Sequence, residues 1–186
     1  MKFIQAKQQL TELRAQATRG EIDLAFADEA GFDQVSPNSY AWTDIGQEHR
    51  HQIDAYRGSR INVIAAIFSN GSATANFSKK TMKALYVAAF LRGLAEGLTK
   101  PLVVVLDNAS IHKAKANKQL IKELEQKKLR LYFLPPYSPE LNRIERLWHK
   151  IKYSWLTPRR RTKDELLSDL MDIFTKYGAD YKFNFM

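Results

Sequence analysis

The chain has 186 residues, enough for one domain with a sizeable core, and its apolar content of 45% is ordinary for a soluble globular protein. It contains no cysteine, which excludes disulfide bonds and thiolate zinc sites, so any bound metal must be held by oxygen or imidazole ligands. No segment approaches the roughly 20 apolar residues that span a bilayer, and the N-terminus leads into a polar segment rather than a signal-peptide core. We therefore expect a cytoplasmic protein with no membrane partner.

Basic residues dominate the charge. Lys and Arg outnumber Asp and Glu by 29 to 20, which gives a net charge of +9 and favours a polyanionic partner. Between residues 21 and 54 there are eight acids and one base, whereas between 143 and 163 there are eight bases and one acid, Glu145. The first stretch is suited to cations and the second to phosphates. Two solvated faces with a chance imbalance would give the same counts, so both interpretations stay open.

The first part of the chain predicts a helix and then three strands. Residues 1–20 carry a weak helical pattern that ends at Gly20, which we interpret as a lead-in helix before a domain at 21–186. The strand predictions rest on alternating or β-favouring residues, and they cover 22–27, 39–44 and 61–69. The first strand stops at Asp28, and the turn signal Asn70-Gly71 closes the third. These strands predict an antiparallel meander.

The second part alternates helices and strands. In order, the patterns predict a helix at 81–98, a strand at 102–106, a Lys-rich helix at 113–127, a strand at 129–134, a helix at 141–155 and a last helix that opens with the capping box at 162–165. The apolar run at 102–106 is typical of a strand buried on both faces, and it ends at Asp107. The fold class that we expect is α/β, a mixed five-stranded sheet flanked by helices.

Two acids therefore follow predicted strands. A single Asp at a strand end is more often structural, because it caps the loop that follows. The pair is harder to explain in that way. If the strands before Asp28 and Asp107 are neighbours, their carboxylates emerge side by side and repel unless a cation lies between them.

Glu145 is the candidate for a third carboxylate. It is the only acid in a basic helix, and it lies near the apolar stripe that includes Ile144 and Trp148. Carboxylate oxygens suit Mg²⁺, and two such ions about 4 Å apart can activate a nucleophile and stabilise the leaving oxygen of a phosphodiester. The alternative is that Glu145 only pairs with Arg146 or His149 along the helix.

Three blocks carry a resemblance to a known family. They are Phe26-Ala27-Asp28-Glu29, then Leu106-Asp107-Asn108-Ala109 with His112, and then LPPYSPELNRIE at 134–145 with Trp148. Together they resemble the catalytic domain of mariner-like transposases and their bacterial insertion-sequence relatives, over roughly residues 21–156. The 37 residues between Asp107 and Glu145 fit the short spacing typical of that group.

The resemblance implies a ribonuclease-H-like fold in which Asp28, Asp107 and Glu145 are catalytic and bind two Mg²⁺ or Mn²⁺ ions. Such enzymes cut double-stranded DNA at transposon ends with water, and the freed 3′ hydroxyl then attacks target DNA, often at a TA dinucleotide. Members usually act as dimers on paired ends. A homodimer associated with the nucleoid is therefore expected.

Two departures from the family pattern are visible. The family commonly has Pro where Arg143 stands, and because Pro suits the first turn of a helix, its absence would loosen the helix start without removing a ligand. Relatives also carry paired helix-turn-helix modules, for which the 20 residues before the first strand have no room. We expect the chain to be a split-frame product that acts with a separate helix-turn-helix chain, a remnant, or part of a longer protein.

Basic and secondary residues complete the predicted site. Phosphate contacts are expected from the basic side chains around and after the third acid, Arg143, Arg146, Lys150, Lys152, Arg159, Arg160 and Arg161, although a solvated basic face would look the same. Asn108 would assist the metal shell or cap its loop, His112 would contact phosphate or satisfy a need within the fold, and His149 would touch the third acid or lie exposed. Trp148 and Trp155 share the apolar stripe and are assigned to the core.

Two other functions compete with a transposase. Another nuclease of the same fold, such as a junction resolvase or ribonuclease H, would share the acids but not the Pro-Pro-Tyr-Ser-Pro block. A transposase-derived DNA-binding protein without catalysis would use the basic helices alone. The presence of all three acids disfavours the second alternative.

Overall fold

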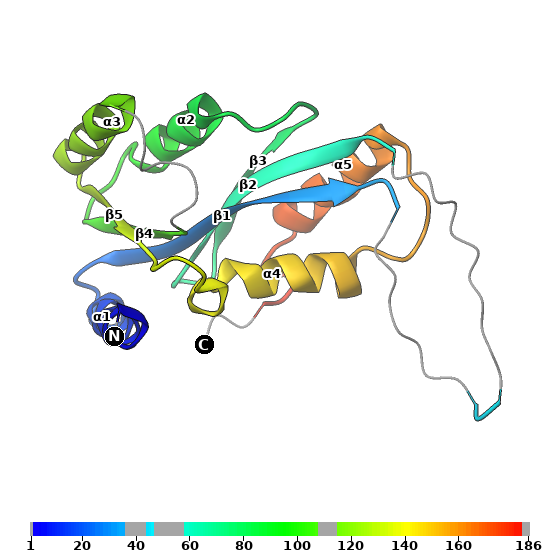
Figure 1. Ribbon diagram of the computed structural model, residues 1–186, viewed down its shortest axis with the longest axis horizontal. Helices are drawn as coiled ribbons and strands as arrows, with labels where there is room; N and C mark the ends of the chain where they lie inside the picture. Colours follow the sequence, from blue (N-terminus) through cyan, green and yellow to red (C-terminus); the bar gives the residue numbers. More distant parts are fainter. Residues whose placement is uncertain (1, 36–43, 47–57, 108–114, 184–186) are drawn as a thin grey trace.

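The computed structural model describes residues 2–35, 44–46, 58–107 and 115–183 (Figure 1). Its elements, in chain order, are α1 (Lys2–Thr18), β1 (Asp23–Asp33), β2 (Arg60–Phe68), β3 (Ala73–Ser78), α2 (Ala84–Leu94), β4 (Leu102–Leu106), α3 (Lys115–Gln126), β5 (Leu129–Phe133), the 3₁₀ turn η2 (Pro139–Leu141), α4 (Ile144–Lys150), the π-helical turn η3 (Ile151–Trp155) and α5 (Lys163–Thr175). Among the described residues no helix combines the length and the apolar character needed to cross a membrane.

The sheet has five strands in the order β3-β2-β1-β4-β5. The pairs β1–β2 and β2–β3 are antiparallel, whereas β1–β4 and β4–β5 are parallel. The predicted mixed five-stranded sheet is thus confirmed. The condition on which the paired acids depended, that the first strand and the strand at 102–106 are neighbours, is also met.

Strand β1 is longer than predicted, and this corrects the placement of Asp28 at a strand end. The strand continues to Asp33, so Asp28 lies in its middle. The prediction stopped early because an acid-rich stretch that leads to Gly31 has the composition of a turn. Strand β2 overrides that local signal by pairing with β1 as far as Asp33↔Arg60, whereas the pairing with β4 ends at Phe26↔Val105.

The third strand of the meander is β3, which the sequence analysis missed. Asn70-Gly71 was interpreted as the end of a strand, but it forms the turn of a β2–β3 hairpin, with Gly71 at φ +86° and Phe68 N–H donating to the Ser72 carbonyl at 2.9 Å. The strand escaped notice because its sequence, ATANFS, is small and polar, as an edge strand can be. Residues 39–43 of the predicted second strand lie outside the described residues.

Helices cover both faces of the sheet. Figure 1 shows α2 and α3 on one side and α1 and α4 on the other, and α5 contributes Leu166, Leu170 and Ile173 to the core on the α1–α4 side. Side chains alternate between the two faces along a strand. In β1, Leu24 and Phe26 accordingly face α1 and α4, whereas Ala25 and Ala27 face α2 and α3.

The last two predicted helices form with adjusted bounds. The helix predicted at 141–155 begins as the separate turn η2, continues as α4 and ends in η3, where Leu156 N–H donates to the Ile151 carbonyl at 2.9 Å. The capping box before α5 is confirmed, with Thr162 and Glu165 exchanging side-chain to backbone hydrogen bonds. Trp148 is buried and Trp155 packs against the same core, as predicted.

Candidate active site

Two carboxylates meet at the end of β4. Asp107 directly follows this strand, and the parallel register Phe26↔Val105, continued by two residues, brings Asp28 opposite Asp107. Strand β1 runs on past the end of β4, and its pairing with β4 ends at Phe26↔Val105. Strand pairing therefore brings together two acids that are 79 positions apart in the sequence.

Both acids belong to the same face of the sheet. Asp28 follows Leu24 and Phe26 at steps of two residues, and Asp107 follows Val103 and Val105 in the same way. All four apolar residues lie in the core on the α1–α4 side. Strand alternation therefore directs both carboxylates towards that side. Asp28 is half-buried and Asp107 is exposed.

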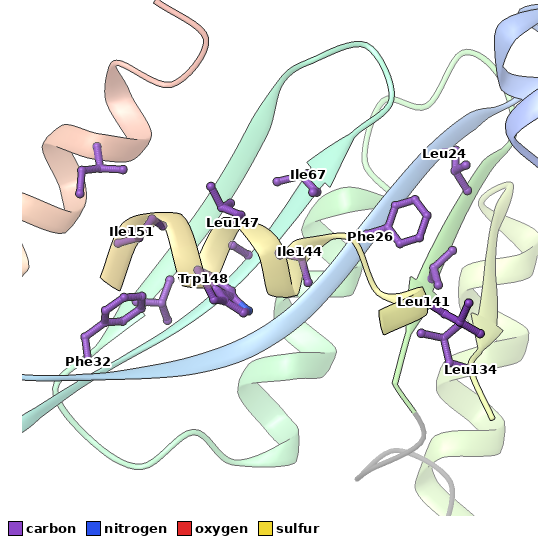
Figure 2. Close-up of a cluster of buried hydrophobic side chains, with 14 of the residues drawn as sticks. Leu24, Phe26, Phe32, Ile67, Leu134, Leu141, Ile144, Leu147, Trp148 and Ile151 are labelled. Atoms are coloured by element: carbon purple, nitrogen blue, oxygen red, sulfur yellow. The ribbon is translucent and has the colours of Figure 1, made fainter. Parts of the chain in front are cut away.

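Glu145 reaches this face from the first turn of α4. The helix is anchored by Ile144 and Leu147, which are fully buried (Figure 2). Its start is tied to β1 by Asn142, whose side-chain amide donates to the Ala27 carbonyl at 3.3 Å, one residue before Asp28. The Asn142 carbonyl in turn accepts the Glu145 N–H at 3.2 Å. One asparagine thus connects the helix that carries the third acid to the strand that carries the first.

Trp148 joins the helix directly to the first acid. Its indole Nε1–H donates to Asp28 Oδ2 at 3.1 Å. The indole ring is also in edge-to-face contact with Phe32, one residue before the end of β1 at Asp33, with centroids 5.9 Å apart. The side chain that was assigned to the core therefore also fixes the orientation of a candidate catalytic carboxylate.

The charges of the three acids are coupled. The pKa of Asp28 is raised to about 7, mainly by burial and also by the nearby negative charges of Glu145 and Asp107, against the opposing effects of the Glu29 N–H and Trp148. The pKa of Glu145 is also raised, first by partial burial and then by Asp107, while Lys152 opposes the rise. Each of these two acids senses the charge of Asp107, so the three carboxylates share one electrostatic site.

This donor set suits a hard divalent cation. It offers carboxylate oxygens alone, and a cation would relieve the repulsion that raises the pKa of Asp28 and Glu145. Within the part of the chain that the structure describes, however, no three His, Asp or Glu side chains are arranged to hold one ion together. Mg²⁺ is usually bound by one or two carboxylates, with phosphate or water for the rest.

The predicted phosphate-binding residues fall into two groups. In the group after α4, Arg161 is only 4% exposed and its guanidinium donates to Asp169 at 2.7 Å, so it is a structural residue that does not reach a ligand. Arg159 is exposed but paired with Glu165 and Asp169, at 3.3 and 3.1 Å. Arg160 forms an isolated backbone bridge with Val35. The structure therefore removes Arg161 from the set of candidate phosphate contacts.

The second group, around α4 and η3, is more exposed than Arg161. Arg146 and Lys150 are exposed, and Arg143 and Lys152 are half-buried. The Lys152 ammonium lies over the Phe32 ring, 5.4 Å from its centroid, and it acts on the Glu145 carboxylate electrostatically. Arg143 has φ −64° and follows an extended Asn142, a backbone that proline would also adopt, so the expected loosening of the helix start is not found.

The structure describes only one of the three secondary residues, His149. Asn108 and His112 lie outside the described residues. His149 is exposed on α4, and its ring packs on Tyr153 with centroids 4.6 Å apart, a partner that was not predicted. Sequence reasoning missed Asn142 and the hydrogen bond of Trp148, although Trp148 is three residues after Glu145 and so shares its helix face, which was a usable signal.

Comparison with known proteins agrees with this geometry. Residues 23–167 match the family described as DDE superfamily endonuclease. A protein of the insertion element IS630 from Shigella sonnei, described as an uncharacterized 39 kDa protein, is 26% identical over 134 residues. The match covers 70% of this chain and 36% of that protein, so the chain spans about a third of the length of its curated relative.

Solved structures of the Mos1 transposase share the fold. A paired-end complex with the left transposon end has a TM-score of 0.72 at 16% identity, covering 97% of this chain and 55% of the other. A Mos1 mariner paired-end complex with Mn has a TM-score of 0.66 at 18% identity, covering 97% and 56%. At these identities the likeness establishes a shared fold, the mixed sheet with helices on both faces.

Proposed function

Because this chain belongs to the DDE superfamily endonuclease family, we propose that it is the catalytic part of a DNA transposase, which cuts DNA strands and joins them to a target. The observation that carries the proposal is the electrostatic coupling of Asp28, Asp107 and Glu145 on one side of the sheet. The fold shared with Mos1 transposase, whose solved complexes contain transposon ends and Mn or Mg, supports it. Residues 21–186 would form the catalytic domain, and 1–20 would lead into it.

The proposed roles of the acids follow from their placement. Asp28, Asp107 and Glu145 would hold two Mg²⁺ or Mn²⁺ ions, with DNA phosphate completing the ligand sets. Such ions supply a nucleophile at neutral pH and stabilise the leaving oxygen of an in-line phosphodiester displacement. Trp148 and Asn142 would position Asp28 and Glu145, because they connect α4 to β1 by hydrogen bonds.

The basic residues of α4 and η3 would hold the DNA. Arg146 and Lys150 lie on α4 with Glu145, Arg143 lies just before it and Lys152 just after it in η3, so phosphates bound there would pass close to the acids. The partner is double-stranded DNA, and the active form is a homodimer on paired ends. A helix-turn-helix module, on a separate chain or elsewhere in a longer protein, would recognise the end sequence.

The test is Mn²⁺-dependent nicking of supercoiled plasmid at low salt, where phosphate contacts persist. Asp107→Asn keeps the shape of the side chain and removes one negative charge from the site, and it should abolish nicking. Asp23→Asn is the matched control, since Asp23 lies in β1 at the far end from the site, in an ion pair with Lys100 at 3.0 Å. The control should nick at the wild-type rate.

The outcomes separate the competing functions. Nicking that survives in Asp107→Asn would refute the carboxylate site. A transposase is supported if Asp107→Asn loses nicking and the wild-type chain also transfers a pre-cut 3′ end into plasmid. Cutting without joining by the wild-type chain would indicate another nuclease of this fold. DNA binding without either activity, unchanged by Mn²⁺, would favour a transposase-derived binding protein.

A further inference from the structure

Helix α1 carries Arg14, which lies near Arg143 and Arg146, the two arginines on either side of Glu145. The helix packs on the α1–α4 side of the sheet, with Leu10 and Leu13 in the same core as Ile144 and Leu147. Arg14 follows Leu13, and its guanidinium lies over the Phe26 ring, 5.8 Å from the centroid. Figure 2 shows Phe26 on β1 beside the chain that leads into α4. Arg14 therefore reaches the surface between α1, β1 and the start of α4.

The Arg14 side chain has an unmet hydrogen-bonding need. Its Nε is buried and has no hydrogen-bond partner. A buried donor without an acceptor is unfavourable, and a charged donor more so. The protein tolerates this arrangement, which is expected where an external acceptor completes the site.

Arg14 also lies among like charges. Its pKa is lowered by burial and then by the positive charge of Arg146. The pKa of Arg143 is lowered by burial and then by the charges of Arg14 and Arg146. The three guanidinium groups, which we call the arginine cluster, therefore repel one another in the free protein, and an anion among them would reverse that repulsion.

Other arginines of the chain show a different pattern. Arg92 forms a forked pair with Glu123, at 2.9 Å for its nearest contact. Arg19, directly after α1, pairs with Glu12 and Glu21. For these side chains an acid of the chain itself supplies the counter-charge. For Arg14, by contrast, the charged neighbour that lowers its pKa is another arginine, Arg146.

The cluster lies beside the candidate carboxylates. Phe26, over which Arg14 is placed, precedes Asp28 by two residues on the same face of β1. Two residues of a strand span about 6.6 Å. Arg143 and Arg146 flank Glu145 directly.

We propose that Arg14, Arg143 and Arg146 form a binding site for one backbone phosphate of DNA next to the phosphodiester that the carboxylates attack. The inference rests on the function proposed above and extends it to a residue outside the matched segment 23–167. Guanidinium groups suit this ligand because they present paired N–H donors to two phosphate oxygens. Helix α1 would thus be part of the DNA-binding surface.

The test measures DNA binding without catalysis. Affinity for a fluorescein-labelled 20-base-pair duplex is followed by anisotropy in EDTA across a salt series. Arg14→Met keeps an unbranched apolar side chain over Phe26, and it should weaken binding about tenfold and lower the salt slope by about 0.9, the value for one lost phosphate contact. Arg19→Met removes a charge directly after the same helix but leaves the cluster intact, and it should change neither quantity.

Thermal stability separates binding from a structural role. In the free protein Arg14→Met should melt no lower than wild type, since it removes a buried unpaired donor and its like-charge repulsion. Loss of binding together with a lower Tm would make Arg14 structural and overturn the proposal. Wild-type affinity and salt slope in Arg14→Met would overturn it as well.

Inorganic phosphate distinguishes the source of the ligand. If it raises the Tm of wild type but not of Arg14→Met, and competes with the duplex, the site takes the phosphate group of DNA. If it raises the Tm while the duplex binds both variants equally, the site takes free phosphate and the DNA proposal is wrong. Because these assays need no metal, they stand even if nicking by the wild-type chain is not found.

Discussion

The two faces of the sheet differ at neighbouring residues of one strand. Asp28 points towards α1 and α4, where it accepts the Trp148 N–H and its pKa is raised by burial, by Glu145 and by Asp107. Glu29 has the opposite parity, on the α2–α3 side, and its pKa is raised by burial and by Asp107 alone. Asp107, at the end of β4, raises the pKa of both acids, but Glu145 on α4 raises only that of Asp28.

The difference shows how a site is built on one face. On the α2–α3 side, core residues such as Leu91, Val104 and Leu124 close the sheet with apolar contacts. On the α1–α4 side the core is equally apolar, but at the end of β4 it gives way to three acids and the arginine cluster. Acids on neighbouring residues of β1 can therefore have unlike functions, because alternation places them in different surroundings.

The largest expected effect is on strand cleavage. Asp28→Asn should reduce Mn²⁺-dependent nicking by more than about 1,000-fold, because metal assistance contributes several kcal/mol to such reactions. Glu29→Gln, which removes the neighbouring charge on the other face, should retain activity within about threefold of wild type, a change of less than 1 kcal/mol. Initial rates of plasmid nicking by equal amounts of folded protein measure both variants. Equal losses in the two variants would mean that the sheet face does not decide which acid is catalytic.

The second expected effect is on the pH dependence of the free energy of unfolding, measured in EDTA. The folded state holds the Asp28 proton to a pH of about 7, above the ordinary value of 3.8 for the unfolded chain. The contribution of this carboxyl to the free energy of unfolding is therefore fully present below its pKa in the unfolded chain, and it is lost as the pH rises through the folded pKa of about 7. Between pH 4 and 8 the free energy of unfolding of Asp28→Asn should therefore rise by on the order of 4 kcal/mol relative to that of wild type.

Urea unfolding at a series of pH values measures that difference. Mn²⁺ should narrow it at pH 8 by stabilising wild type, since a cation favours the ionised carboxylates, and it should leave Asp28→Asn less affected. A difference between the two proteins that stays constant from pH 4 to 8 would show that Asp28 is not held protonated by its surroundings.

The smallest expected effect comes from Trp148→Phe. This change keeps an aromatic ring in the core but removes the N–H that donates to Asp28 at 3.1 Å. Without that donor the pKa of Asp28 should rise further, so the acidic limb of the nicking profile should move to higher pH and activity at pH 7 should fall about tenfold, or 1.4 kcal/mol. Trp155→Phe, at the partly buried tryptophan of η3, is the control and should keep the wild-type pH profile.

Much of the fold was predictable from local patterns. The continuous apolar run at 102–106 identified the central strand, because only a strand covered on both faces has no polar alternation. The capping box at Thr162 identified the start of α5 through chemistry confined to four residues. The three acids were likewise selected from the sequence, by their place after apolar runs and within a basic helix. Their catalytic role stays a prediction.

Other features depended on contacts between distant segments. The end of β1 was decided by β2, whose pairing carries the strand through acidic residues that predict a turn on their own. The grouping of basic residues was decided by α5 and α1: Asp169 buries and neutralises Arg161, whereas α1 sets Arg14 beside Arg143 and Arg146. Sequence alone determined which side chains could ionise and which segments would form the helices and four of the five strands, but not the edge strand β3. Tertiary packing decided which of these charges meet an acid of the chain and which meet like charges, because folding brings Arg14 beside arginines more than a hundred residues away.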